Sequence, residues 1–130
     1  MKRILFLTAG LIFTVVSSAG TRNPGWDHLG TRKVNKTHDR DEIVVTRAEG
    51  TFNALKFKVQ NRAITLYDMK VHYGNGTVED IKVRVHLPAG GESRVIDLRG
   101  GNRVINKVIF RYETKRVRGR RATVLLFGRH

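Results

Sequence analysis

The sequence predicts an all-β protein whose strands pack as an antiparallel β-sandwich. Apolar and polar residues alternate in several separate stretches, which is the pattern of strands buried on one side. These stretches recur at even intervals between Gly, Asn and Pro residues, and none after Gly20 keeps helical spacing. Hydrophobic residues make up 40 % of the chain, enough to support a core. A jelly-roll arrangement fits these strands, and a closed β-barrel is the alternative.

The predicted strands follow from where this alternation begins and ends. Over 81–87, for example, apolar residues at odd positions alternate with Lys82, Arg84 and His86. The alternation slips between Leu55 and Phe57 and again near Tyr67-Asp68, where β-bulges are expected. About eight or nine strands are expected. They lie near 26–34, 42–48, 51–60, 62–73, 77–87, 93–98, 103–114 and 120–128.

Two hairpins can be tested by residue parity, because residues that face each other across a strand pair lie on one side of the sheet. A two-residue turn at Asn75-Gly76 would set Val71 opposite Asp80 and mix core with solvent. A longer loop, which sets Val71 opposite Ile81, is therefore predicted.

The second hairpin is expected at the end of the chain. Pairing Tyr112 with Ala122 also pairs Phe110 with Val124, which keeps one apolar face. This register would place residues 115–120 at an exposed tip.

The first 19 residues have the three parts of a secretory signal peptide. Lys2-Arg3 precedes an apolar run over 4–16, and small residues at 17–19 offer a cleavage site. The run is shorter than the about 20 residues of a membrane-spanning helix, so no transmembrane anchor is expected. The prediction is a signal peptide over 1–19, cleaved near Ala19, and one β-sandwich domain over 20–130, periplasmic or extracellular. The chain has no cysteine, which excludes disulfides.

Three stretches are more specific than general strand patterning. They are Trp26-Asp27-His28-Leu29-Gly30, Ser93-Arg94-Val95-Ile96-Asp97-Leu98, and Ala122-Thr123-Val124 with Phe127-Gly128. Together they resemble the YaaI-like family of short exported bacterial proteins, whose function is not established. The likeness covers nearly all of the chain after the signal. It implies the fold and the compartment, and it implies no catalytic or ligand-binding residue.

Two single residues invite a structural or a functional interpretation. Trp26, the only tryptophan, either plugs one end of the core or offers a platform for a sugar ring or a base. Asp97 lies close in sequence to Arg94, Arg99 and Arg103, so a structural ion pair is expected there.

No pattern in the sequence is typical of a catalytic or metal site. The five histidines are scattered, and Ser93 lacks the glycines of a nucleophile elbow. Asp39, Asp41 and Glu42 could offer oxygen ligands to calcium, but they lack the EF-hand spacing, and an acidic turn is the preferred interpretation. We therefore expect no enzyme, no cofactor and no metal.

Positive charge is the strongest functional signal. Lys and Arg number 25 against 11 Asp and Glu, a formal net charge of +14. The densest cluster is Lys115, Arg116, Arg118, Arg120 and Arg121. Because the arginine fork suits phosphate, sulfate and carboxylate, this loop is predicted to dock on an anionic lipid, lipopolysaccharide or acidic glycan of the cell envelope.

Other interpretations remain open. The cations could only keep a small exported domain soluble and discourage aggregation at sheet edges. The protein could also be an interaction or assembly subunit of the envelope with a protein partner, or an enzyme whose catalytic groups lie far apart in the sequence. Nucleic acid is not expected, because the signal directs export and the aromatic residues mostly alternate in core phase.

Overall fold

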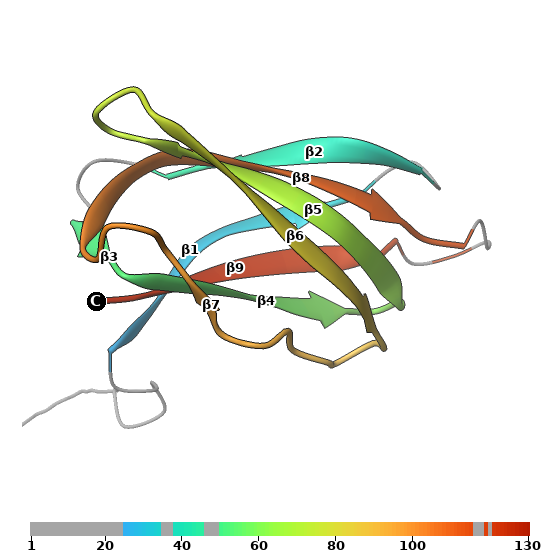
Figure 1. Ribbon diagram of the computed structural model, residues 1–130. Coiled ribbons are helices and arrows are strands. Elements are labelled where there is room, and N and C mark those ends of the chain that lie inside the picture. Colours follow the sequence, from blue (N-terminus) through green and yellow to red (C-terminus); the bar gives the residue numbers. More distant parts are fainter. Residues whose placement is uncertain (1–24, 35–37, 46–49, 116–118, 120) are drawn as a thin grey trace, which may run out of the picture.

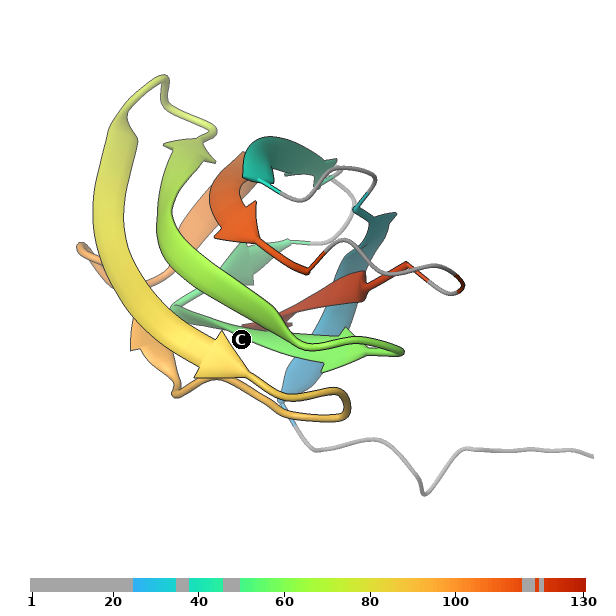
Figure 2. The ribbon, with the colours of Figure 1, turned by 90° about the vertical axis from the view of Figure 1, so that its right-hand side faces the viewer.

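Two antiparallel sheets face each other in the computed structural model (Figures 1 and 2). It describes residues 25–34, 38–45, 50–115, 119 and 121–130, so the predicted signal peptide over 1–19 lies outside the described residues. The strands are β1 (Trp26–Lys33), β2 (His38–Val44), β3 (Thr51–Phe52), β4 (Ala54–Gln60), β5 (Ile64–Tyr73), β6 (Val78–Leu87), β7 (Ile96–Asp97), β8 (Arg103–Glu113) and β9 (Thr123–Arg129).

The strand order confirms the predicted β-sandwich. Sheet 1 has the order β1-β9-β4-β7, and sheet 2 has the order β2-β8-β5-β6, with β3 pairing with β8. The described strands thus form two sheets rather than one sheet closed on itself, which the alternative required.

Apolar and polar residues alternate along the strands, so each sheet has one apolar face. The apolar faces of the two sheets pack against each other and form the core. Phe57 on β4 and Phe110 on β8 are fully buried, and their ring centroids lie 5.8 Å apart across the sandwich. Burial of each such side chain stabilises the fold by about 1.5–3 kcal/mol. The other large, fully buried side chains include Tyr112, Phe52, Leu55, Ile64, Leu66, Met69, Ile105 and Leu126.

The predicted strand over 51–60 is divided between the two sheets. Thr51–Phe52 pairs with β8 in sheet 2, whereas the chain after Asn53 pairs with β9 in sheet 1. The slip expected between Leu55 and Phe57 is therefore wrong, because β4 keeps one register from Ala54 to Gln60. The expected slip near Tyr67-Asp68 is confirmed, since both neighbours of β5 change register between Leu66 and Asp68.

The hairpin between β5 and β6 has a loop longer than two residues, as predicted. The Tyr73 amide donates to the Thr77 carbonyl (2.9 Å), and Gly76 supplies a φ of 90° within the loop. The register differs from the prediction by two residues, because Val71 lies opposite Glu79 instead of Ile81. Parity excluded the tight turn, but it could not distinguish two registers that differ by a full strand period.

The predicted hairpin between Tyr112 and Ala122 is wrong. β8 pairs with β2 and β5 in sheet 2, whereas β9 pairs with β1 and β4 in sheet 1. Phe110 and Val124 are both buried in the core. The parity test requires only that both residues face the core, and this holds whether they pair within one sheet or face each other from two sheets. The segment over 114–122 therefore joins two sheets and is not the tip of a hairpin.

Candidate anion-binding site

Backbone and side-chain contacts assemble one end of the sandwich, on the right in Figure 1, from segments far apart in the sequence. The Thr114 hydroxyl donates to the Ala63 carbonyl (2.8 Å), which ties the end of β8 to the turn between β4 and β5. The Val34 amide donates to the Ala122 carbonyl (3.0 Å), which brings the end of β1 beside the start of β9. In the chain, Lys115 directly follows Thr114 and Arg121 directly precedes Ala122, so the two described ends of the basic segment lie at these contacts.

Cations from four places in the chain converge at this end. Lys33 ends β1, Arg62 lies in the turn after β4, and Lys115 and Arg121 flank the connection between the sheets. We call these four residues the basic end. Lys115 and Arg121 are exposed, and neither makes an ion pair with any residue that the structure describes. Of the predicted cluster, the other members lie outside the described residues: Arg116, Arg118 and Arg120.

A cavity of about 510 Å³ opens at the basic end. Arg62 and Lys115 supply its cations, and Thr65, His86 and Glu113 supply polar groups from three neighbouring strands. The Thr65 hydroxyl and His86 Nδ1 lie 2.9 Å apart. The volume is within the range of small-ligand sites, and the mixture of cations and hydrogen-bonding groups suits an anionic ligand with hydroxyls.

Glu113 is the acid in the cavity lining, and its carboxylate already has a partner. It accepts a hydrogen bond from the Tyr67 hydroxyl, and that bond raises the pKa of Tyr67 above its usual value. The phenol therefore stays protonated at physiological pH and continues to donate. This bond occupies one oxygen of Glu113, while its carboxylate keeps its negative charge.

The acidic cluster is divided between the two sides of a strand. Asp39, Asp41 and Glu42 all lie in β2, which begins at His38, so the prediction of an acidic turn before a strand over 42–48 is wrong. Asp41 pairs with Arg32 (2.7 Å). Glu42 points to the other side, where its carboxylate lies 3.7 Å from the ammonium of Lys107.

This arrangement also bears on the calcium alternative. Because neighbouring residues in a strand face opposite sides, Asp41 and Glu42 cannot jointly hold one ion. Across the described ranges, no three His, Asp or Glu residues gather closely enough to hold a metal.

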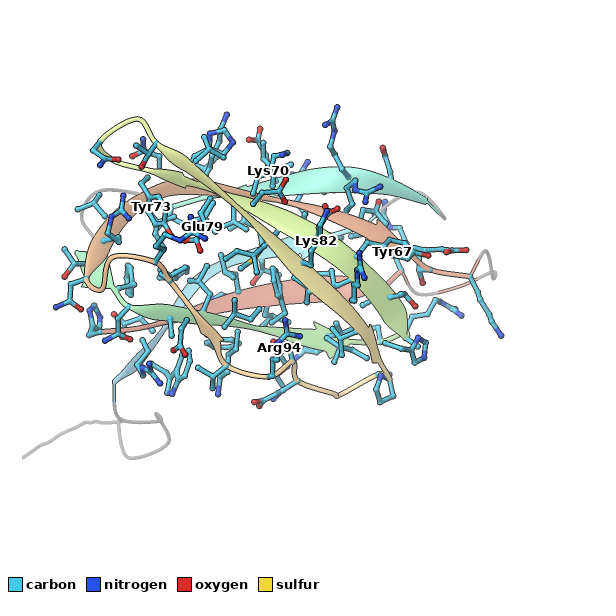
Figure 3. The ribbon with its side chains drawn as sticks, in the orientation of Figure 1. Tyr67, Lys70, Tyr73, Glu79, Lys82 and Arg94 are labelled. Carbon is cyan, nitrogen blue, oxygen red and sulfur yellow. The ribbon has the colours of Figure 1, made fainter. Side chains whose placement is uncertain are left out.

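Trp26 lies on the outside of sheet 1, so the prediction that it plugs one end of the core is wrong. It is half-buried, with Lys56 Nζ 4.4 Å from its ring centroid. Asp97 forms the expected ion pair, but with Arg129 (3.3 Å). Arg94 instead donates to the Val83 carbonyl (2.8 Å) and covers the edge of β6 (Figure 3).

The sequence interpretation missed Lys33, Arg62 and His86 as neighbours of the basic segment. Each lies at the end of a predicted strand, which is a signal that the sequence contains. Which strand ends lie together at one end of the sandwich depends on the topology. The predicted hairpin between β8 and β9 gave a wrong topology, because these strands belong to different sheets.

The geometry defines a β-sandwich with a basic end, and comparison in sequence then identifies its family. The chain belongs to the family described as "Domain of unknown function (DUF2541)", which it matches over residues 5–128. This agrees with the expected family of unestablished function, while the YaaI-like name remains a resemblance. No curated protein matches the chain in sequence.

A solved structure described as "Structural and functional characterization of Pseudomonas aeruginosa AlgX" is similar to the chain. The identity is 16 % and the TM-score is 0.48, over 77 % of this chain and 26 % of that one. The chain thus spans about a quarter of the length of that protein. Within the part of the chain that the structure describes, no helix is long and apolar enough to cross a bilayer.

Proposed function

We propose that this protein is an exported, non-enzymatic module that binds an anionic component of the cell envelope through its basic end. The observation that carries the proposal is the convergence of Lys33, Arg62, Lys115 and Arg121 at the end where the basic segment joins the two sheets. Arg62 and Lys115 also line the cavity there.

The positive charge of the basic end favours binding of an anion. The cavity lining has two cations, Arg62 and Lys115, and one acid, Glu113, which accepts a hydrogen bond from Tyr67. The two neighbouring cations Lys115 and Arg121 have no described ion-pair partner, so their charge is available to an external anion. Concentrated positive charge of this kind raises the rate of encounter with a polyanion and makes the affinity depend on ionic strength.

The non-enzymatic part of the proposal rests on the polar groups of the cavity. Thr65 and His86 are directly opposite each other on β5 and β6, and their hydrogen bond is a cross-strand contact of the kind that stabilises a sheet. Export rests on the signal-like composition of residues 1–19, with its basic start, apolar run and small residues.

The proposal is tested with protein purified from cells that express the full chain. Its mass reports whether cleavage occurs near Ala19, and its binding to inorganic polyphosphate is measured between about 50 mM and about 300 mM salt. We expect binding that weakens at least about tenfold over this range, because several cations release counterions. Replacing Arg116, Arg118, Arg120 and Arg121 with Ser should remove most of the affinity.

The matched control removes the same charge from the outside of sheet 2. It replaces Arg40, Lys70, Lys82 and Arg84 with Ser and should bind polyphosphate nearly as well as the parent. Equal losses in the two variants would show that only net charge matters and would contradict a specific basic end. Envelope binding that persists at high salt would favour the alternative, a protein-interaction or assembly subunit.

A further inference from the structure

The outside of sheet 1 carries a row of aromatic and apolar side chains. Trp26 lies opposite Arg129, His28 opposite Phe127, and Thr31 opposite Leu125, so these residues share one face. The rings of His28 and Phe127 lie 5.4 Å apart. We call Trp26, His28, Leu125 and Phe127 the aromatic strip; His28 is exposed and the other three are half-buried.

Lysines from β4 and β1 border the aromatic strip. Lys56 Nζ lies over the Trp26 ring and 3.3 Å from Glu92, so its charge is already shared. Lys58 lies opposite Leu125 on the same face. Neither Lys58 nor Lys33 makes an ion pair with a described residue, which leaves two cations beside the strip for an external anion.

The aromatic strip leads directly to the basic end. Lys33, the last residue of β1, lies opposite Thr123, and Arg121 precedes Thr123 by two residues. Because a strand rises about 3.3 Å per residue, β1 provides a length of about 23 Å from Trp26 to Lys33. A ligand that reaches from the strip to the basic end must therefore be an extended chain.

The chemistry of the two parts points to one class of extended ligand. Sugar rings present an apolar C–H face that packs against aromatic rings. In the strip, His28 is exposed and Phe127 is half-buried, while Lys56 and Arg129 lie over the Trp26 ring. Carboxylate or sulfate groups on the same chain pair with Lys58, Lys33 and the basic end. Inorganic phosphate chains offer no apolar face for the strip.

A membrane fits the strip less well. Trp26 and Phe127 are half-buried against the sheet, and ion pairs of Lys56 and Arg129 lie beside them, so insertion into a bilayer would bury charged groups. The most exposed large hydrophobic residues are elsewhere, on strands or loops outside β1, β4 and β9: Val44, Val78 and Val95.

We propose that the aromatic strip, with Lys33 and Lys58, is a binding track for an acidic polysaccharide chain whose charged groups continue onto the basic end. This inference rests on the proposed function only in that the ligand is anionic. It adds that the ligand has sugar rings and that the outside of sheet 1 recognises them.

Trp26 supplies a direct readout, because it is the only tryptophan of the chain. Its fluorescence is followed while the full-chain protein is titrated with polygalacturonate, heparin, inorganic polyphosphate or vesicles of anionic phospholipid. We expect the two polysaccharides to change the emission of Trp26, and polyphosphate to bind at the basic end without changing it. A change with vesicles and none with polysaccharides would overturn the proposal in favour of a membrane.

Variants locate the effect. His28→Ala with Lys58→Ser should lower the affinity for polygalacturonate about tenfold, because one ring contact and one charge contact are lost. The affinity for polyphosphate should stay unchanged. The matched control on sheet 2, His72→Ala with Lys82→Ser, should alter neither. Unchanged polygalacturonate binding in the first variant, with its fold intact by circular dichroism, would refute the track.

The two proposals fail separately. Absence of polyphosphate binding, while polygalacturonate still changes the emission of Trp26, would reject the basic end and leave the track standing. Polyphosphate binding through the basic end, together with polysaccharide binding that never reaches Trp26, would reject the track alone.

Discussion

The outer faces of the two sheets differ, although their inner faces follow the same alternation. On the outside of sheet 2, cations are matched with acids: Arg111 with Asp68, and Lys70 with Asp80 at 2.9 Å. Lys70 and Lys82 lie along this face in Figure 3. The outside of sheet 1 also has ion pairs, Lys56 with Glu92 and Arg129 with Asp97, but it carries the aromatic strip between them. Lys58 makes no described ion pair there. The two faces therefore differ in the aromatic strip of sheet 1, which we propose as the binding track.

The outer faces of the two sheets can be compared only if the inner faces pack equally well. Substitutions on the inner faces test this, and they should have the largest effect on stability. Phe57→Ala in sheet 1 and Phe110→Ala in sheet 2 should each lower the free energy of unfolding by about 3–5 kcal/mol, because each removes a fully buried ring and leaves a cavity. Denaturation in guanidinium chloride measures both.

Both losses should fall within this range of about 3–5 kcal/mol, because both rings are fully buried. A much smaller loss for one phenylalanine would show that its sheet packs loosely. In that case the outer faces could not be compared as two sides of one rigid sandwich.

Removing the ion pair between Arg111 and Asp68 on sheet 2 should have a smaller effect on stability. Arg111 donates twice to Asp68, with Nε 3.0 Å from Oδ1 and Nη2 2.5 Å from Oδ2, and this bond lowers the pKa of Asp68. Asp68→Asn should lower the melting temperature by about 2 to 4 °C at neutral pH, since the arginine is open to solvent. On sheet 1, Asp97→Asn should have almost no effect, because Asp97 is 83 % exposed.

The pH dependence fixes the sign of the Asp68 effect. A carboxyl with a lowered pKa in the folded state stabilises the fold above the unfolded value of about 3.9, and the contribution disappears as the pH falls through the folded value. The difference in melting temperature between the parent and Asp68→Asn should therefore be full above about pH 5 and shrink in more acidic solution. A difference that grows on acidification would contradict the ion pair.

Much of the fold was predictable because apolar alternation reports which residues face the core. Strands near 26–34, 62–73, 77–87 and 103–114 correspond closely to β1, β5, β6 and β8. β2 begins at His38, earlier than the predicted strand over 42–48. The prediction missed its first residues because Asp39 to Glu42 are all polar, so no apolar alternation marks them as a strand. That edge strand instead tolerates a charge on its inner side, where Asp41 meets Arg32.

The pairing of strands was less predictable than their positions. Residues such as Phe110 and Val124 satisfy the same parity whether they are neighbours in one sheet or face each other between two sheets. For this reason the parity test wrongly placed the basic segment at the tip of a hairpin. Its selection as a functional candidate rested on composition alone and did not depend on strand pairing. Lys33 and Arg62 could join it only once the topology was known.

Amide chemical shifts measured during titration with polygalacturonate test the central claim, that ligand binds sheet 1 and the basic end but not the outside of sheet 2. We expect the largest changes in β1, β9 and around Arg62 and Lys115, while the amides of residues 69–82 stay in place. Largest changes within 69–82, or changes spread evenly over both sheets, would contradict the claim.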